Sequence, residues 1–235
     1  MLELYQLSKL IRDQWILDHI SCTIEDGTII GLLGPNHSGK STLLKILAGF
    51  MRKTSGEIRL DGKTLPGSMQ KFCSIVASDN TIPLTLTLTE LLRWYPILYP
   101  DFDREIATEF CKEYLSDWHH PLSSFSQGEI ALLNLIMGCT RKVRLYLLDE
   151  PLRNIDENAQ TILLSLVSTC QDKSAIFLIS SHDPREYETM LDQALILHCG
   201  KLVADEKPDL LRSKHHESLT EFYREVISNH EHPSV

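Results

Sequence analysis

A glycine-rich segment at residues 34–41 constrains the fold of this chain more than any other feature. It reads Gly-Pro-Asn-His-Ser-Gly-Lys-Ser and satisfies the pattern G-x-x-x-x-G-K-[ST]. An apolar run at residues 29–33 precedes it, and a stretch with helical spacing begins at Lys40. A strand, a glycine turn and a helix in this order gather backbone N–H groups and the positive end of the helix around one point. The segment therefore predicts a phosphate-binding loop in an α/β domain.

The residue types of this loop suit a nucleoside triphosphate, and ATP is the expected ligand. Lys40 would reach the β and γ phosphates, and the Ser41 hydroxyl would ligate Mg²⁺. We expect the His37 side chain to point away from the phosphates, because the loop interior has no room for it. The alternative, a glycine-rich turn before an ordinary helix, is disfavoured by the flanking strand and helix. The predicted nucleotide-binding residues here are Gly34, Pro35, Asn36, His37, Ser38, Gly39, Lys40, Ser41 and Thr42.

A second apolar run, residues 145–148, ends in the two carboxylates Asp149 and Glu150. Beside a phosphate-binding loop, Asp149 would hold Mg²⁺, usually through water, and Glu150 would polarise the attacking water. The alternative is a buried strand with a solvated acidic end, which would be preferred if the loop were absent. Together the two motifs predict a P-loop NTPase with Ser41 and Asp149 at the metal and Glu150 as a catalytic residue.

Composition limits the partners of this chain. Its 235 residues suit one large domain or one and a half. The net charge of -9 disfavours nucleic acid, because such a field repels a phosphate backbone. The six cysteines show no Cys-x-x-Cys spacing, which is typical of reduced cytosolic thiols. No apolar run reaches the ~18 residues that span a bilayer, so a membrane role would need a partner.

Periodicity divides the chain into a β-rich start, a helical middle and an alternating end. The expected strands are 3–7, 16–24, 28–33, 56–60, 145–148 and 175–180, followed by a hairpin of 193–198 and 201–205. The expected helices are 40–50, 89–94, 102–115, 126–137 and 210–227, with breaks at Tyr95-Pro96 and Tyr99-Pro100 and a loop at 118–124. The predicted division is a core of residues 1–83 and 139–235 with a helical subdomain at 84–138.

The segment Ser123–Glu129 precedes one of these helices and adds a third motif. Ser126 followed by Glu129 fits a capping box, so alone it predicts only a helix start. With the other motifs, however, the chain resembles the ATP-binding subunits of ABC transporters, whose signature L-S-G-G-Q stands at this distance before the acidic strand. The resemblance covers essentially the whole chain and includes Asp156 in the D-loop position and His182 after an apolar strand.

The resemblance implies an α/β fold: a P-loop NTPase core with a mixed sheet, N-terminal antiparallel strands and a helical insertion. Two such subunits would sandwich two ATP molecules head to tail. Ser126 and Gly128 of one subunit would then contact the γ-phosphate held by Lys40 of the other. His182 would hydrogen-bond that phosphate and the attacking water.

The resemblance also implies partners and a place in the cell. The chain would form a homodimer, or a heterodimer with a related ATPase subunit, and would drive a separate integral-membrane permease. It would be cytoplasmic and peripheral on the inner face of the membrane through that permease. The segment Tyr99–Asp103 looks like a subgroup of bacterial exporter ATPases, so export is the expected direction.

Besides His37, which replaces the usual small residue of the loop, three departures from the family pattern bear on ATP affinity or hydrolysis. Ser78 or Asp79 stands where a Q-loop glutamine is usual, and no glutamine occurs between Phe72 and Thr89. The position of the adenine-stacking aromatic is Ile11, with Trp15 nearby as a substitute or as a packed strand residue.

The third departure is Glu129, which replaces the last signature residue and is expected to cap its own helix. These departures leave open a second function, a slowly hydrolysing dimerisation switch or nucleotide sensor. A third option, a soluble ABC ATPase acting on ribosomes or DNA, is disfavoured by the acidic charge and the single cassette.

Overall fold

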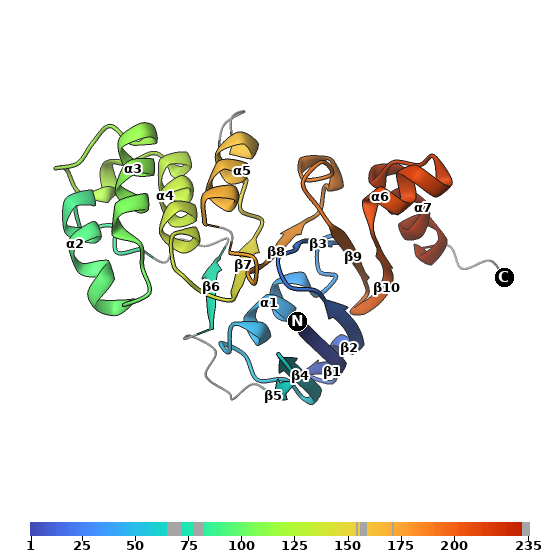
Figure 1. Cartoon of the computed structure of the whole chain (residues 1–235). Coiled ribbons are helices and arrows are strands. Elements are labelled where there is room, and N and C mark those ends of the chain that lie inside the picture. The colour runs from blue at the N-terminus through green and yellow to red at the C-terminus, as the bar shows by residue number, and fades with distance from the viewer. Residues whose placement is uncertain (65–71, 78–81, 154, 156–158, 171, 232–235) are drawn as a thin grey trace.

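A six-stranded sheet forms the centre of the chain in the computed structural model, which describes residues 1–64, 72–77, 82–153, 155, 159–170 and 172–231 (Figure 1). Its strand order is β10-β9-β3-β8-β7-β6. The first five strands in sequence run parallel, and β10 pairs antiparallel with β9. The strands are β3 (Ile29–Leu33), β6 (Cys73–Val76), β7 (Leu145–Asp149), β8 (Ile176–Ser181), β9 (Gln193–His198) and β10 (Lys201–Glu206). This mixed sheet confirms the predicted fold class.

A second sheet, entirely antiparallel, has the order β2-β1-β4-β5. Its strands are β1 (Leu2–Ile11), β2 (Gln14–Ile24), β4 (Ser55–Leu60) and β5 (Lys63–Thr64). Apolar side chains of β1 and β2, among them Leu4 and Ile20, belong to the same buried cluster as α1 (Lys40–Leu47) and one face of the central sheet. The N-terminal antiparallel strands therefore cover the face of the central sheet on which α1 lies.

The other face of the central sheet is covered by the remaining helices. In Figure 1, α2, α3 and α4 stand together beyond β6, whereas α6 and α7 lie beyond β9 and β10. These helices are α2 (Leu88–Leu98), α3 (Arg104–Tyr114), α4 (Gln127–Cys139), α5 (Ala159–Cys170), α6 (Pro208–Leu210) and α7 (Leu219–Glu231), with short turns η1 (Leu122–Ser124), η2 (Pro184–Glu186) and η3 (Leu211–His215). Across the described ranges, no helix combines the length and the apolar character needed to cross a bilayer.

The continuous apolar runs of the central strands follow from burial on both faces of the sheet. Leu145 and Leu147 of β7 pack in the cluster with α1, whereas Tyr146 and Leu148 pack in the cluster with the other helices. Successive side chains of a strand point to opposite faces, so both sets must be apolar. The Tyr146 ring stacks on Phe177 of β8 at a centroid distance of 4.2 Å. The predicted central parallel strands are confirmed.

Two predicted helix boundaries in the first half of the chain were wrong. Helix α1 ends at Leu47 and not near residue 50, because Gly49 adopts φ +77° and its N–H closes onto Ile46 O. Tyr95-Pro96 was expected to break a helix, yet α2 runs through Pro96 to Leu98. Pro96 lies in the last turn, where its missing N–H removes one hydrogen bond and leaves the earlier turns intact, and Tyr99-Pro100 ends the helix.

The predicted single helix at 210–227 was also wrong. The chain forms α6, η3 and α7, with His216 at φ +54° between the last two. Ser218 and Glu221 form a reciprocal cap: Ser218 N donates to Glu221 Oε2 at 2.9 Å, and Glu221 N donates to Ser218 Oγ at 3.2 Å. This Ser-x-x-Glu pair starts a new helix at Leu219.

A buried ion pair ties the C-terminal end of α4 to the α2–α3 connection and to β6. The Arg141 side chain, 7% exposed, donates from Nε and Nη2 to the two oxygens of Asp101 at 2.9 and 2.7 Å. Its Nη1 donates to Cys73 O at 3.1 Å, and the guanidinium lies over the Tyr99 ring. One side chain therefore joins the helices α2–α4 to an edge strand of the central sheet.

We expect Asp101→Ala to lower the free energy of unfolding by about 2–3 kcal/mol, because it leaves a buried guanidinium without its bidentate partner. Urea unfolding followed by circular dichroism measures this change. Lys142→Ala, which removes an exposed partner of Asp103, is the matched control and should cost less than about 1 kcal/mol. Equal losses in the two variants would contradict the buried-pair explanation.

Candidate functional site

The loop at residues 34–39 is held by close backbone contacts that only glycine allows. A Cβ at Gly34 would lie 2.2 Å from Leu197 O of β9. Gly39 adopts φ +108°, and a Cβ there would lie 2.7 Å from Ile16 O of β2. From the turn between β9 and β10, Gly200 N donates to Ser38 O at 3.1 Å. Strands of both sheets thus contact the loop.

Two donors inside this loop are available to an anion. Lys40 is 5% exposed, and its Nζ donates to Gly34 O at 2.7 Å and to Pro35 O at 3.0 Å. Burial lowers the pKa of Lys40, and the negative charges of Glu150 and Asp149 oppose this shift. Ser38 Oγ is buried and has no hydrogen-bond partner within the described part of the chain. A buried ammonium and an unpaired hydroxyl beside the N-terminus of α1 fit a phosphate group.

A cavity of about 470 Å³ adjoins the loop, within the usual size range of ligand pockets. Gln14 and Ile16 of β2 and Glu150 line it together with seven consecutive residues of the loop and the start of α1, which are Asn36, His37, Ser38, Gly39, Lys40, Ser41 and Thr42. His37 is exposed, as expected for a side chain outside the loop interior. Neither Ile11 nor Trp15 lines this cavity, so β2 contributes Gln14 and Ile16 to it instead.

Asp149 lies at the end of β7, where two hydroxyl groups converge on one of its oxygens. Ser41 Oγ donates to Asp149 Oδ1 at 3.0 Å, and Ser180 Oγ donates to the same oxygen at 2.7 Å. The structure therefore brings together Ser41 and Asp149, the two predicted metal-binding residues. Ser180 is not among the site residues predicted from the sequence. The feature that could have indicated it is a serine at the end of an apolar run, two residues before His182.

Glu150 and His182, the two predicted catalytic residues, are neighbours. His182 Nδ1 lies 3.4 Å from Glu150 Oε1, and Arg153 Nη1 lies 3.8 Å from Glu150 Oε2. Glu150 is a non-glycine residue at φ +49° that follows directly on β7. Arg153 was not selected from the sequence, although its position three residues after Glu150 allows the contact.

Ser126 and Glu129 form the predicted capping box at the start of α4. Ser126 N and Oγ both donate to Glu129 Oε2 at 2.8 Å, and Glu129 N donates to Ser126 Oγ at 3.2 Å. The capping role of Glu129 is thus confirmed. Ser126 is exposed, and neither it nor Gly128 lines the cavity at the phosphate loop.

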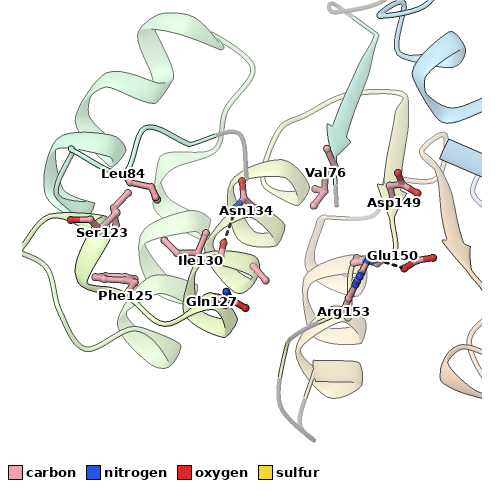
Figure 2. A pocket seen from close by; sticks show the side chains of 14 residues that line it. Val76, Leu84, Ser123, Phe125, Gln127, Ile130, Asn134, Asp149, Glu150 and Arg153 are labelled. Carbon is pink, nitrogen blue, oxygen red and sulfur yellow. Dashed lines mark hydrogen bonds and ion pairs between the residues drawn. The ribbon is translucent and has the colours of Figure 1, made fainter. Parts of the chain in front are cut away.

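A second cavity, of about 380 Å³, separates α4 from the end of β7. Figure 2 shows Gln127, Ile130 and Asn134 of α4 on one side and Glu150 and Arg153 on the other. Leu84 and Phe125 make part of its wall apolar. The signature helix and the acidic strand of one chain are therefore separated by a cavity and not packed together at this level.

Three residues discussed from the sequence lie outside the described residues. They are Asp156 in the D-loop position and Ser78 and Asp79 in the Q-loop position.

The sequence pattern described as "ABC transporter" matches residues 17–153, which is more than half of the chain. The chain belongs to the ABC transporter family. It is an ATP-binding domain of that family and an ATPase.

Curated relatives agree with this assignment. The chain is 30% identical over 211 residues to the ABC transporter ATP-binding protein YybJ of Bacillus subtilis (strain 168), covering 88% of this chain and 97% of YybJ. It is 31% identical over 205 residues to YtrB of the same organism, covering 86% of this chain and 70% of YtrB. It is 30% identical over 201 residues to the zinc import ATP-binding protein ZnuC of Pseudomonas fluorescens (strain Pf0-1), covering 84% and 74%.

Solved structures agree with the fold. The ATP-binding subunit of an ABC transporter superposes with a TM-score of 0.86 at 25% identity, covering 97% of this chain and 99% of that one. A dimeric ATP-binding cassette in a post-hydrolysis state with ADP and Pi superposes with a TM-score of 0.76 at 19% identity, covering 88% and 98%. The predicted ABC ATPase fold is therefore confirmed.

We expect Gly39→Ala to weaken ATP binding at least about tenfold, because the new methyl group would overlap Ile16 O and push the ABC ATPase loop away from its phosphate-binding shape. Equilibrium binding of a fluorescent ATP analogue measures the effect. Gly62→Ala is the matched control, since Gly62 also has positive φ but open space around it. Comparable loss of affinity in both variants would contradict the contact explanation.

Proposed function

We propose that this chain is the ATPase subunit of an ABC transporter, closing as a dimer around two ATP molecules to drive a separate membrane permease. The observation that carries this proposal is the convergence of Ser41 and Asp149 beside the Glu150–His182 pair. A phosphate-binding loop, a metal-binding pair and a base with a neighbouring histidine are the parts that phosphoryl transfer to water requires.

The residues present fit Mg²⁺ bound between the nucleotide and the acidic strand. The Ser41 hydroxyl uses its proton for Asp149 Oδ1, which leaves its oxygen lone pairs for a metal ion. Asp149 would hold the ion through its other oxygen or through water. The ion would supply charge neutralisation at the phosphate oxygens.

Glu150 is proposed as the general base. Its carboxylate is half-buried at the edge of the phosphate-loop cavity, where it can accept a proton from water placed against the γ-phosphate. His182 would orient the carboxylate through Nδ1, which lies 3.4 Å from Glu150 Oε1, and would hydrogen-bond the phosphate through its other ring nitrogen. Lys40 would stabilise the charge that develops on the phosphate oxygens.

The exposed start of α4 supports a composite site between two subunits. Backbone N–H groups of the first turn and the helix dipole attract anions, and Ser126 and Gly128 stand at this end. Neither residue lines its own chain's phosphate-loop cavity. The proposed role of both is therefore to contact the γ-phosphate of ATP bound to a second copy or to a related subunit. Asp156 is proposed to lie at the same interface.

A permease partner is proposed for the groove between α4 and the end of β7, whose walls include Leu84 and Phe125. The subunit would then be peripheral on the cytoplasmic face of the membrane. Export is proposed from the segment Tyr99–Asp103 alone. It has no support from the relatives named above, of which ZnuC is a zinc import protein. The predicted division into a core and a helical subdomain at residues 84–138 belongs to the same proposal.

One observation favours the second candidate, a slowly hydrolysing nucleotide sensor. The Ser126 hydroxyl is already engaged with Glu129, which also adds a negative charge beside the proposed phosphate contact. Negligible single-turnover hydrolysis despite tight ATP binding would favour the sensor over the transport ATPase.

We expect Glu150→Gln to reduce ATP hydrolysis by at least about 100-fold, because it removes the proposed general base, and to trap an ATP-dependent dimer. Phosphate release and light scattering measure the two effects. Glu25→Gln, at the opposite end of the central strands, is the control and should hydrolyse ATP normally. Undiminished hydrolysis by the Glu150 variant would refute the proposed mechanism.

We expect Glu129→Gln to strengthen ATP-dependent dimerisation about fivefold, because glutamine keeps the cap but removes a negative charge beside the phosphate. Sedimentation of the Glu150→Gln background with and without this change measures the shift. Glu113→Gln on the exposed face of α3 is the matched control. An equal dimer affinity in the two variants would mean that Glu129 does not face a partner's nucleotide.

A further inference from the structure

We propose that Ser180 is a positioning residue of the ATPase site, which orients both the metal-side carboxylate of Asp149 and the backbone of Glu150 through one hydroxyl group. The inference rests on the proposed roles of these two acids. It gives a role to Ser180, which stands two residues before His182 and is not among the predicted site residues.

The sheet register brings Ser180 to this point. Strand β8 lies between β3, which leads into the phosphate loop, and β7, which ends in the acids. Ser180 is the direct neighbour of Asp149 on one side and of Leu32 on the other. Side chains of paired residues on adjacent strands leave the sheet on the same face. The pairing of β7 with β8 therefore places the Ser180 and Asp149 side chains next to each other.

The Ser180 hydroxyl is fully buried and has both a donor and an acceptor role. It donates to Asp149 Oδ1 at 2.7 Å and accepts from Glu150 N at 2.9 Å. A hydroxyl has a single proton, so the two bonds use different parts of it and can exist together. One group thus holds two consecutive residues of the acidic motif.

For Asp149, the consequence is a fixed carboxylate orientation. Ser180 and Ser41 both donate to Oδ1, and neither of these bonds uses Oδ2. Rotation of the carboxylate would break two hydrogen bonds at once. The carboxylate is held with Oδ1 turned toward the two hydroxyl groups, and Oδ2 is left for the metal side.

For Glu150, the consequence is a fixed backbone. Its φ of +49° is uncommon for a residue with a side chain, and such a conformation persists where the surroundings hold it. The bond from Glu150 N to Ser180 Oγ is one such contact. It fixes the point from which the Glu150 side chain extends toward His182, 3.4 Å away.

A serine that merely fills hydrogen bonds at a strand end would affect stability alone. Ser74 provides that comparison, because it is also a buried serine of the central sheet and donates one hydrogen bond, to Gly138 O at 2.8 Å. It has no bond to Asp149 or Glu150. Ser180→Ala and Ser74→Ala therefore both remove a buried hydroxyl, but only the first removes contacts to the acids.

The test uses the full chain with Ser180→Ala, Ser180→Thr and Ser74→Ala. We expect Ser180→Ala to lower kcat by about 10–100-fold and to raise the Mg²⁺ concentration for half-maximal binding of a fluorescent ATP analogue by about the same factor. Binding of the analogue without Mg²⁺ should change less than about twofold, because Lys40 and the loop are untouched. Ser180→Thr keeps the hydroxyl and should recover most of the loss, and Ser74→Ala should resemble the wild type in both measurements.

The proposal is overturned if Ser180→Ala keeps the wild-type kcat and Mg²⁺ dependence, or if a folded Ser180→Thr is as impaired as the alanine variant. Thermal unfolding of each variant shows whether it is folded. If Ser180→Ala is unfolded at the assay temperature, Ser180→Cys takes its place, because a thiol has a similar volume to the hydroxyl but is a weak hydrogen-bond donor. The cysteine variant must then show the same raised Mg²⁺ requirement. Glu150→Gln separates the two proposals: hydrolysis by that variant refutes the proposed mechanism, whereas its loss together with an unaffected Ser180→Ala refutes this inference alone.

Discussion

The parallel register of β3, β8 and β7 is the constraint on which the site depends. It places the end of the phosphate-loop strand, Ser180 and Asp149 at one level of the sheet. Because both faces of the sheet are buried in closely packed layers, a slip of one residue would exchange every side chain of a strand between two layers that it does not fit. The core thus fixes the register, and the register brings Ser41 to Asp149.

The sequence predicted those parts of the fold and of the site that depend on local spacing. The phosphate loop, the acidic strand end and the Glu129 cap each lie within a few consecutive residues, where side-chain type and chain geometry are read together. Ser180 could not be found in this way, because its contact with Asp149 depends on strand pairing across 31 residues. The continuation of α2 through Pro96 was missed because proline is expected to end a helix, whereas in the last turn the loss of one hydrogen bond leaves the earlier turns in place.

The two halves of the proposed ATP site differ in how far their residues are buried and hydrogen-bonded within the chain. Lys40, Asp149 and Ser180 are buried and hydrogen-bonded within the central sheet and the loop. Ser126 stands exposed at a helix start, with its hydroxyl shared with Glu129. One chain therefore carries a buried, hydrogen-bonded phosphate site. It also carries the exposed start of α4, where the Ser126 hydroxyl is hydrogen-bonded within the same chain. In the proposed dimer, this helix start faces the partner's nucleotide.

The Arg141 ion pair anchors the C-terminal end of α4, whereas the N-terminal end of the helix has no comparable anchor among the contacts described above. Its C-terminal end is joined to Asp101 and Cys73, whereas its N-terminal end carries Ser126. A helix of this length, 13 residues, spans about 20 Å, so a tilt of about 10° around the fixed end displaces the other end by about 3 Å. That displacement equals the length of one hydrogen bond. In the proposed dimer, a small rotation at the anchored end would therefore decide whether Ser126 lies within bonding distance of the partner's phosphate.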